Sequence, residues 1–451
     1  MRLTRLTTAG LALAGLAAAP LQVQALTMEE AVQAAVIYHP QIQRDEALER
    51  AADHAIEEAY SRYLPRLDAE ASTGYEVTTS PVTRGAGRGT VDEIRSESSI
   101  TLQQLVTDGG ATPGLVAAAR ANRRGAVGDL QETSELIAID TVQLYLNILR
   151  DMDFVSRGEE NVREHEELND LVSGLVEAGR GSEADSAQSQ SRLALAQATL
   201  EELRGGLREV TSRFIEITGQ DPRDLSVPAF PEEYSEPVSI DEALANAIDG
   251  NPSIEATAAR VDQTQHEIRV ARSSYYPQVN VEAFATANEN LNGTKGFDGD
   301  FNARARATWN IFNGFGDLAR VRRAEMLHNA QNGTFDDESR RIREETRVVW
   351  DSLVTARDRV VPLREHVGAQ RRVFAAYRGQ FDVGRRTLLD LLDAQNELFQ
   401  AELQLIDAEF NVDVAEYELV FVQGQLLNAL GVVVPSEEDF HNERGETAEG
   451  S

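Results

Sequence analysis

The 451-residue sequence contains no cysteine, so disulfide bonds, thiolate metal sites and cysteine nucleophiles are all excluded. It contains a single lysine, Lys295, so almost all of its positive charge is carried by arginine. Acidic residues outnumber basic ones by 32. Because binding to a phosphate backbone requires a basic face, we expect no nucleic-acid partner.

Catalytic and cofactor motifs are also missing from the sequence. Its seven histidines form no His-Glu-x-x-His pattern, and the glycine-rich segment 85–89 lacks the Gly-Lys-Ser/Thr of a phosphate-binding loop. Carboxylates are too numerous for one pair to stand out as an acid and a base. We therefore expect no enzymatic activity, no cofactor and no metal site.

Long apolar runs are absent after the N-terminus, and no later stretch approaches 18 residues, so no transmembrane helix is expected in the mature chain. Residues 1–25 resemble a secretory signal, with two early arginines, an Ala/Leu-rich core at 6–21 and a small-residue cleavage site at 23–25. Two classes remain open at this point: a soluble exported protein, and a β-barrel. The membrane-spanning strands of a β-barrel are recognised by the alternation of apolar and polar residues. The acidic tail, 435–451, has no pattern and is predicted to be disordered.

An internal repeat organises the chain. Residues 26–67 align with 238–279 at a constant offset of 212, with 12 identities in 42 positions. Both copies contain a Thr/Ser-x-x-Glu helix start and two prolines that end helices. The sequence therefore predicts two structural repeats, 26–219 and 238–434, joined by the proline-rich linker 220–237.

After Pro65 and Pro277 the polarity of the sequence alternates with a period of two. This pattern predicts four strands, grouped as two hairpins with glycine-rich loops, at about 66–78, 94–106, 278–289 and 300–312. Alternation of this length is typical both of membrane-spanning strands and of a half-buried soluble sheet. Four strands are too few to close a barrel, so a spanning barrel would have to be shared between chains.

Two stretches from about 115 to 219 and from about 317 to 431 are rich in helix formers, and glycine turns interrupt them at Gly179 and Gly384. In the second stretch an apolar residue recurs every seven positions from Leu391, followed three positions later by a small residue, usually alanine. Helices of about 60 residues are about 90 Å long, so they predict coiled-coil rods or the wall of a helical cylinder.

The whole mature chain resembles the TolC family of outer-membrane channels, and a few segments carry this resemblance. They are the two Thr/Ser-x-x-Glu-Ala openings, the two Tyr-x-Pro junctions and residues 384–398; segments 290–293 and 309–314 resemble its type I secretion branch. The resemblance implies an α+β membrane protein with internal duplication. Three chains of four strands each would close a 12-stranded β-barrel, continued by a long α-helical coiled-coil barrel.

The same resemblance implies a location and partners. It places the protein in the cell outer membrane with a periplasmic helical extension, as a homotrimer surrounded by outer-membrane lipid. It further implies a periplasmic adaptor protein and an inner-membrane ABC transporter or other pump. The predicted function is passive transport as the exit duct of a type I protein secretion system. The alternatives are the outer-membrane component of a multidrug efflux pump and, less favoured, a soluble periplasmic coiled-coil scaffold.

A periplasmic aperture is the functional site that the resemblance implies. It assigns Asp390 and Asp393 to this aperture, where the i, i+3 spacing puts both on one helical face and three chains would stack two acidic rings. Without the family match, two solvated surface aspartates would be favoured. The family pattern also implies gate links by Asp185, Arg386 and Phe381. The phenylalanine replaces a tyrosine common in the family and cannot donate a hydroxyl hydrogen bond.

Overall fold

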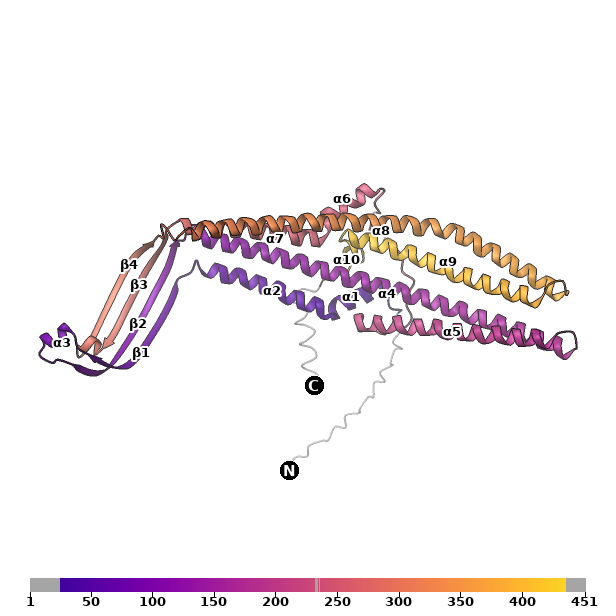
Figure 1. Cartoon of the computed structure of the whole chain (residues 1–451), viewed down its shortest axis with the longest axis horizontal. Helices are drawn as coiled ribbons and strands as arrows, with labels where there is room; N and C mark the ends of the chain where they lie inside the picture. Colours follow the sequence, from indigo (N-terminus) through magenta and orange to yellow (C-terminus); the bar gives the residue numbers. More distant parts are fainter. Residues whose placement is uncertain (1–24, 232–233, 235, 435–451) are drawn as a thin grey trace, which may run out of the picture.

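The structure is a computed structural model that describes residues 25–231, 234 and 236–434. The predicted tail and residues 1–24 of the predicted signal lie outside the described residues. The chain forms a long molecule with a β-sheet at one end and helices along the rest of its length (Figure 1). Among the described residues, no helix combines the length and the apolar character needed to cross a bilayer.

The elements follow the duplication. The first repeat contains α1 (Met28–Tyr38), α2 (Pro40–Ser61), β1 (Arg66–Thr78), α3 (Pro81–Gly85), β2 (Val91–Thr107), α4 (Ala111–Glu177) and α5 (Glu183–Thr218). The second contains α6 (Ile240–Gly250), α7 (Pro252–Arg272), η1 (Ser273–Tyr275), β3 (Gln278–Glu289), η2 (Leu291–Gly293), β4 (Phe297–Thr308), α8 (Gly316–Asp382), α9 (Leu388–Val422) and α10 (Leu426–Ala429).

The short helices begin where the sequence supplies caps. Thr27 accepts a hydrogen bond from the Glu30 backbone N–H, and the Glu30 side chain accepts one from the Thr27 backbone N–H, which completes a capping box for α1. Pro40 and Pro252 occupy the first positions of α2 and α7, where a missing N–H costs no helical hydrogen bond. These caps fix where each repeat enters its helices.

The four strands form one antiparallel sheet in the order β1-β2-β3-β4, so β2 and β3 join the two repeats directly. Pairs such as Leu67 with Leu102 and Ala285 with Phe301 place apolar side chains on one face. That face is uncovered in one chain: Leu67 is 67% exposed and Phe301 75%. Since β1 and β4 each have one unpaired edge, a single chain leaves both an apolar face and two edges open.

The structure differs from the sequence prediction around two strands. The fourth strand ends at Thr308 rather than near 312, because the chain turns at Trp309, whose indole N–H donates to the Tyr275 carbonyl (3.1 Å). Phe315, with φ of 67°, then precedes α8. The glycine-rich segment after β1 also contains the short helix α3, which Ser80 caps.

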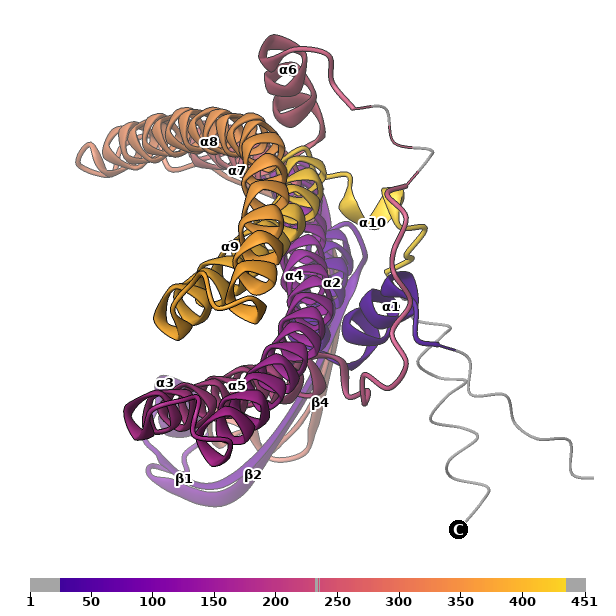
Figure 2. The ribbon, with the colours of Figure 1, turned by 90° about the vertical axis from the view of Figure 1, so that its right-hand side faces the viewer.

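The long helices form a curved wall. Both α4 and α8 contain 67 residues and are therefore about 100 Å long. Helix α4 packs against α2, α5, α7 and α9, and α8 packs against α7 and α9. Viewed from the end, the helices follow an arc, and α1 and α10 lie on its convex side (Figure 2). The alanines predicted at the seam of α9, Ala394, Ala401, Ala408 and Ala415, are all buried.

The linker between the repeats crosses the middle of this wall. Leu225 forms a parallel β-bridge with Leu26, and the buried Tyr145 hydroxyl lies 2.8 Å from the Leu26 carbonyl and 2.6 Å from that of Ser226. Further on, the Phe230 ring packs at a tilt against buried Tyr417, with 5.3 Å between the ring centres. The described part of the linker thus packs against the largest apolar core, in which side chains of α1, α4, α5, α9 and α10 meet.

Candidate aperture at the helical tips

Each pair of long helices reverses direction at a glycine. Gly179 (φ 70°) follows α4 and Gly384 (φ 72°) follows α8, and this backbone conformation strongly favours glycine. Ser182 and Thr387 then cap α5 and α9. Both turns lie at the end of the molecule opposite the sheet (Figure 1). The two halves of the chain therefore bring two equivalent tips to one end.

Asp390 is the third residue of α9 and completes its capping box. The carboxylate accepts hydrogen bonds from the Thr387 hydroxyl (2.8 Å) and backbone N–H (3.3 Å), and Arg386 lies 3.7 Å away. The bonds from Thr387, with Arg386 nearby, lower the pKa of Asp390 below its usual value. Asp390 therefore stays charged, and its 39% exposed side chain keeps that charge at the tip.

Asp393 lies one turn further along α9 and contacts the other repeat. Its carboxylate accepts a hydrogen bond of 2.8 Å from Arg192 of α5. The Asp393 side chain remains half exposed, and such pairs contribute at most about 1 kcal/mol. The sequence analysis missed Arg192, because no local pattern places a residue of α5 beside one that is 201 positions away.

The three predicted gate residues are not joined within one chain. Asp185 repeats the capping role of Asp390: it bonds to the Ser182 hydroxyl at 2.7 Å. Arg386 contacts its own hairpin, since its guanidinium donates to Gln380 (3.1 Å) and lies 4.0 Å from the centre of the Tyr377 ring. Among the described residues of a single chain, no ion pair links Arg386 to Asp185.

Phe381 packs into an apolar cluster beneath the tip turn instead of forming a polar link. The buried members of this tip cluster are Leu168, Val172, Leu388, Leu391 and Leu392, and Phe374, Tyr377 and Phe381 pack against them. The three aromatic residues recur at helical spacing in the sequence, a signal that could have predicted this cluster. The tip turn of the second repeat is therefore supported by an apolar core that it shares with α4 of the first repeat.

Leu391→Ala should destabilise the tip strongly. Leu391 is fully buried in the tip cluster, and truncating a buried leucine costs about 2–5 kcal/mol. Hydrogen exchange of the amides at 386–395 should report the lost protection. Leu389→Ala is the matched control, because Leu389 is 47% exposed and its truncation should cost no more than about 0.5 kcal/mol. Equal protection in both variants would refute the role of the cluster.

Above the tip cluster, polar contacts also join the two repeats. Gln395 of α9 donates to Glu164 of α4 at 3.1 Å, and Glu402 lies 3.5 Å from Arg157. Within the described residues, the Gln395 Oε1, Asn161 Oδ1 and His165 Nδ1 atoms are buried without a hydrogen-bond partner. Burial, with Arg192 nearby, lowers the pKa of His165 to about 4.

The contact between the two hairpins is thus of mixed character. Apolar side chains of α4 and α9 meet in the tip cluster, and polar side chains of the same helices meet above it. The tips therefore combine charged carboxylates with direct packing between the two repeats.

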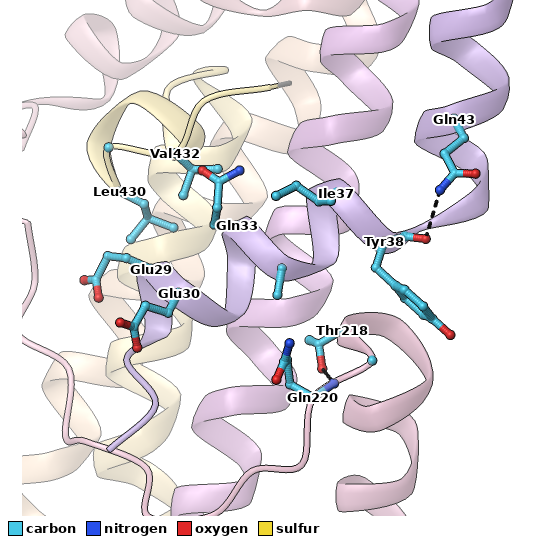
Figure 3. Close-up of a pocket in the computed structure, with 13 residues that line it drawn as sticks. Glu29, Glu30, Gln33, Ile37, Tyr38, Gln43, Thr218, Gln220, Leu430 and Val432 are labelled. Atoms are coloured by element: carbon cyan, nitrogen blue, oxygen red, sulfur yellow. Dashed lines mark hydrogen bonds between the residues drawn. The ribbon is translucent and has the colours of Figure 1, made fainter. Parts of the chain in front are cut away.

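A pocket of about 750 Å³ lies elsewhere, between α1, the end of α5 and the segment after α10 (Figure 3). Glu30, which lines it, is already engaged in capping α1, and Gln43 donates to the Tyr38 carbonyl at 3.5 Å. The pocket belongs to the α1 and α10 region on the convex side of the wall. These features make it a weaker candidate for a transport site than the tips.

Comparison with known proteins identifies the class of this molecule. The family model "Outer membrane efflux protein" matches residues 31–220 and 243–425, which include most of both repeats. The chain belongs to the outer membrane efflux protein family, the family of TolC, and its location is the outer membrane. The resemblance found in the sequence is therefore confirmed.

Two relatives show the range of the family. The chain is 24% identical to the outer membrane efflux protein BepC of Brucella suis over 380 residues, 84% of this chain and 80% of BepC. It is 23% identical to the alkaline protease secretion protein AprF of Pseudomonas aeruginosa over 394 residues, 84% of this chain and 78% of AprF.

Solved structures share the fold. The Campylobacter jejuni CmeC outer membrane channel superposes with a TM-score of 0.77 at 14% identity, covering 92% of this chain and 88% of CmeC. The outer-membrane channel OprN gives a TM-score of 0.76 at 20% identity, covering 88% of this chain and 89% of OprN. The predicted α+β fold, with four strands continued by long helices, is confirmed.

Proposed function

We propose that three copies of this chain form a duct through the outer membrane that serves as the exit of a type I protein secretion system. The observation that carries the channel is the sheet with two unpaired edges and an uncovered apolar face. Pairing β4 of one copy with β1 of the next satisfies both edges and turns the apolar face toward lipid. The long helices then continue the wall away from the membrane.

The secretion role is supported by the similarity to AprF, whose name records secretion of a protease. A periplasmic adaptor protein and an inner-membrane ABC transporter are the partners that such a duct requires. Efflux of small molecules with another pump is the second candidate function, and the similarity to BepC favours it. Both functions use the same passive duct, so they differ in partners and cargo rather than in this chain's chemistry.

We further propose that Asp390 and Asp393 ring the periplasmic aperture. The capping geometry keeps Asp390 charged, and the contact of Asp393 with Arg192 ties the two tips of one chain together. In three copies, six carboxylates would surround the opening. Arg386, whose guanidinium stacks on Tyr377, and Asp185, at the tip of the other repeat, would then face each other between neighbouring chains.

Deletion of the gene distinguishes the two functions. If the chain serves secretion, the deletion strain should lose a large exported protein from its culture supernatant, while its sensitivity to antibiotics and dyes changes little. Expression of the full chain from a plasmid should restore the supernatant protein. Normal secretion together with raised drug sensitivity would overturn the secretion role and support efflux.

A further inference from the structure

The polar face of the sheet carries a group of arginines near the helices. In the β3–β4 register Glu282 lies opposite Arg304, and Arg306 is two residues closer to the helical end of β4. Their neighbours Ala283, Ala303 and Ala305 belong to the opposite, apolar face. If the sheet closes into a barrel with its apolar face toward lipid, both arginines lie in the lumen at the base of the barrel.

The two guanidinium groups share a single carboxylate. The Arg304 Nε donates to Glu282 Oε2 at 2.9 Å, and the Arg306 Nε lies 3.3 Å from the same oxygen. Each guanidinium has five N–H donors, and these contacts use one of each. The arginine side chains are about half exposed, whereas Glu282 is 13% exposed. This group of three side chains thus carries one excess positive charge per chain, on guanidinium groups that are half exposed.

An aromatic ring holds this group in place. Phe284 lies on the same polar face, and the Arg304 guanidinium carbon is 5.2 Å from the centre of its ring. A phenylalanine on an otherwise polar face orders the guanidinium without neutralising its charge. Arg304 is therefore positioned rather than free to extend in any direction.

The charge changes sign further from the helices. The next residues of the same face on β4 are Asn302, Asp300 and Asp298, and their register partners on β3 are Phe284, Thr286 and Asn288. Glu70 lies at the level of Ser99 on the neighbouring pair of strands, again on the polar face. Cargo that moves outward from the helical end therefore passes the two arginines before it enters an acidic zone.

We propose that Arg304 and Arg306 form an oxyanion-binding site at the base of the barrel lumen, where they contact carboxylate or phosphate groups of the passing cargo. This inference rests on the proposed channel. Arginine pairs suit this role because the planar guanidinium matches carboxylate and phosphate geometry. In a pore, such a site attracts anionic groups that the acidic zone further along the strands repels.

Block of single channels in planar bilayers tests the proposal. Sodium tripolyphosphate and an oligoglutamate, added on the barrel side of the purified full-length protein, represent the two oxyanion classes. Both should interrupt the current of the unmodified protein. The double variant Arg304→Gln with Arg306→Gln should weaken the block roughly tenfold, the scale on which fixed charge changes local ion concentration.

Two further variants sharpen the result. Arg95→Gln is the matched control, because Arg95 lies on the same face but contacts two carboxylates, Glu76 and Glu97, and its loss should weaken the block far less than the double substitution does. Glu282→Gln should strengthen the block, a change that misfolding cannot imitate. Equal block of the unmodified protein and the double variant would overturn the oxyanion-binding site, while the proposed channel function would still stand. No conductance at all from the unmodified protein would instead contradict the channel.

Discussion

Replacing Asp390 and Asp393 together by asparagine should lower the preference of the channel for cations over anions several-fold. The substitution removes two charges per chain, and therefore six around an opening formed by three chains. Asparagine retains an oxygen that can accept the Thr387 hydrogen bonds, so the capping of α9 should persist. The reversal potential of the channel in a salt gradient measures the effect.

Asp185→Asn is the control for this experiment. Asp185 caps α5 as Asp390 caps α9, but the position equivalent to Asp393 is Gln188, so the first tip carries only one of the two carboxylates. The control should shift the reversal potential less than the double substitution does. A double variant with the selectivity of the unmodified protein would remove Asp390 and Asp393 from the aperture.

The attachment of the C-terminal segment, residues 425–432, to α4 should weaken as the pH rises from about 4.5 to 7. Glu135 of α4 is 5% exposed and accepts hydrogen bonds from the backbone N–H groups of Leu426 (3.1 Å) and Leu427 (3.3 Å). Burial raises the pKa of Glu135 to about 7, although these two bonds oppose the shift. The folded state thus binds a proton that the unfolded state has released.

The sign and size of this effect follow from proton linkage. Since the folded pKa is the higher one, the stabilisation is fully present below pH 4.5 and is lost as the pH rises through 7. Its upper limit is about 3 kcal/mol. Glu135→Gln cannot ionise, so the variant should show almost no pH dependence at this segment.

Hydrogen exchange at residues 425–432, corrected for the intrinsic pH dependence, is the appropriate measurement. A global melting temperature is unsuitable because His165, whose pKa is lowered to about 4, contributes the opposite slope in an overlapping pH range at the tips. Equal protection of the segment at pH 5 and pH 8 would contradict the prediction. So would a Glu135→Gln variant that keeps the pH dependence of the unmodified protein.

Much of the fold could be predicted because both repeats contain prolines at the same helix-to-strand junctions. Pro65 and Pro277 follow the ends of α2 and η1 at equivalent places, and β1 and β3 begin directly after them. The fourth strand was placed too far along because the alternation of large and small residues continues through Trp309 and Ile311, although the backbone turns there. The pairing of β2 with β3 could not be predicted, since it joins residues about 170 to 190 positions apart.

The candidate site was predicted less completely than the fold. The position of Asp390 after a Thr-x-x-Asp start was visible in the sequence, whereas its capping role in place of a free carboxylate was not considered. Arg192 and Tyr377 were missed because their contacts depend on how helices pack side by side. Contacts across a helix interface follow from the relative rotation of the helices, which the period of each helix alone does not determine.

The most direct test of the central claim is the mass of the protein extracted from cells. After cell fractionation, the mature chain should be found in the outer-membrane fraction and should leave it only with detergent. Native mass spectrometry of the extracted material should give the mass of three chains. Recovery of a single mature chain in the soluble periplasmic fraction would contradict the account.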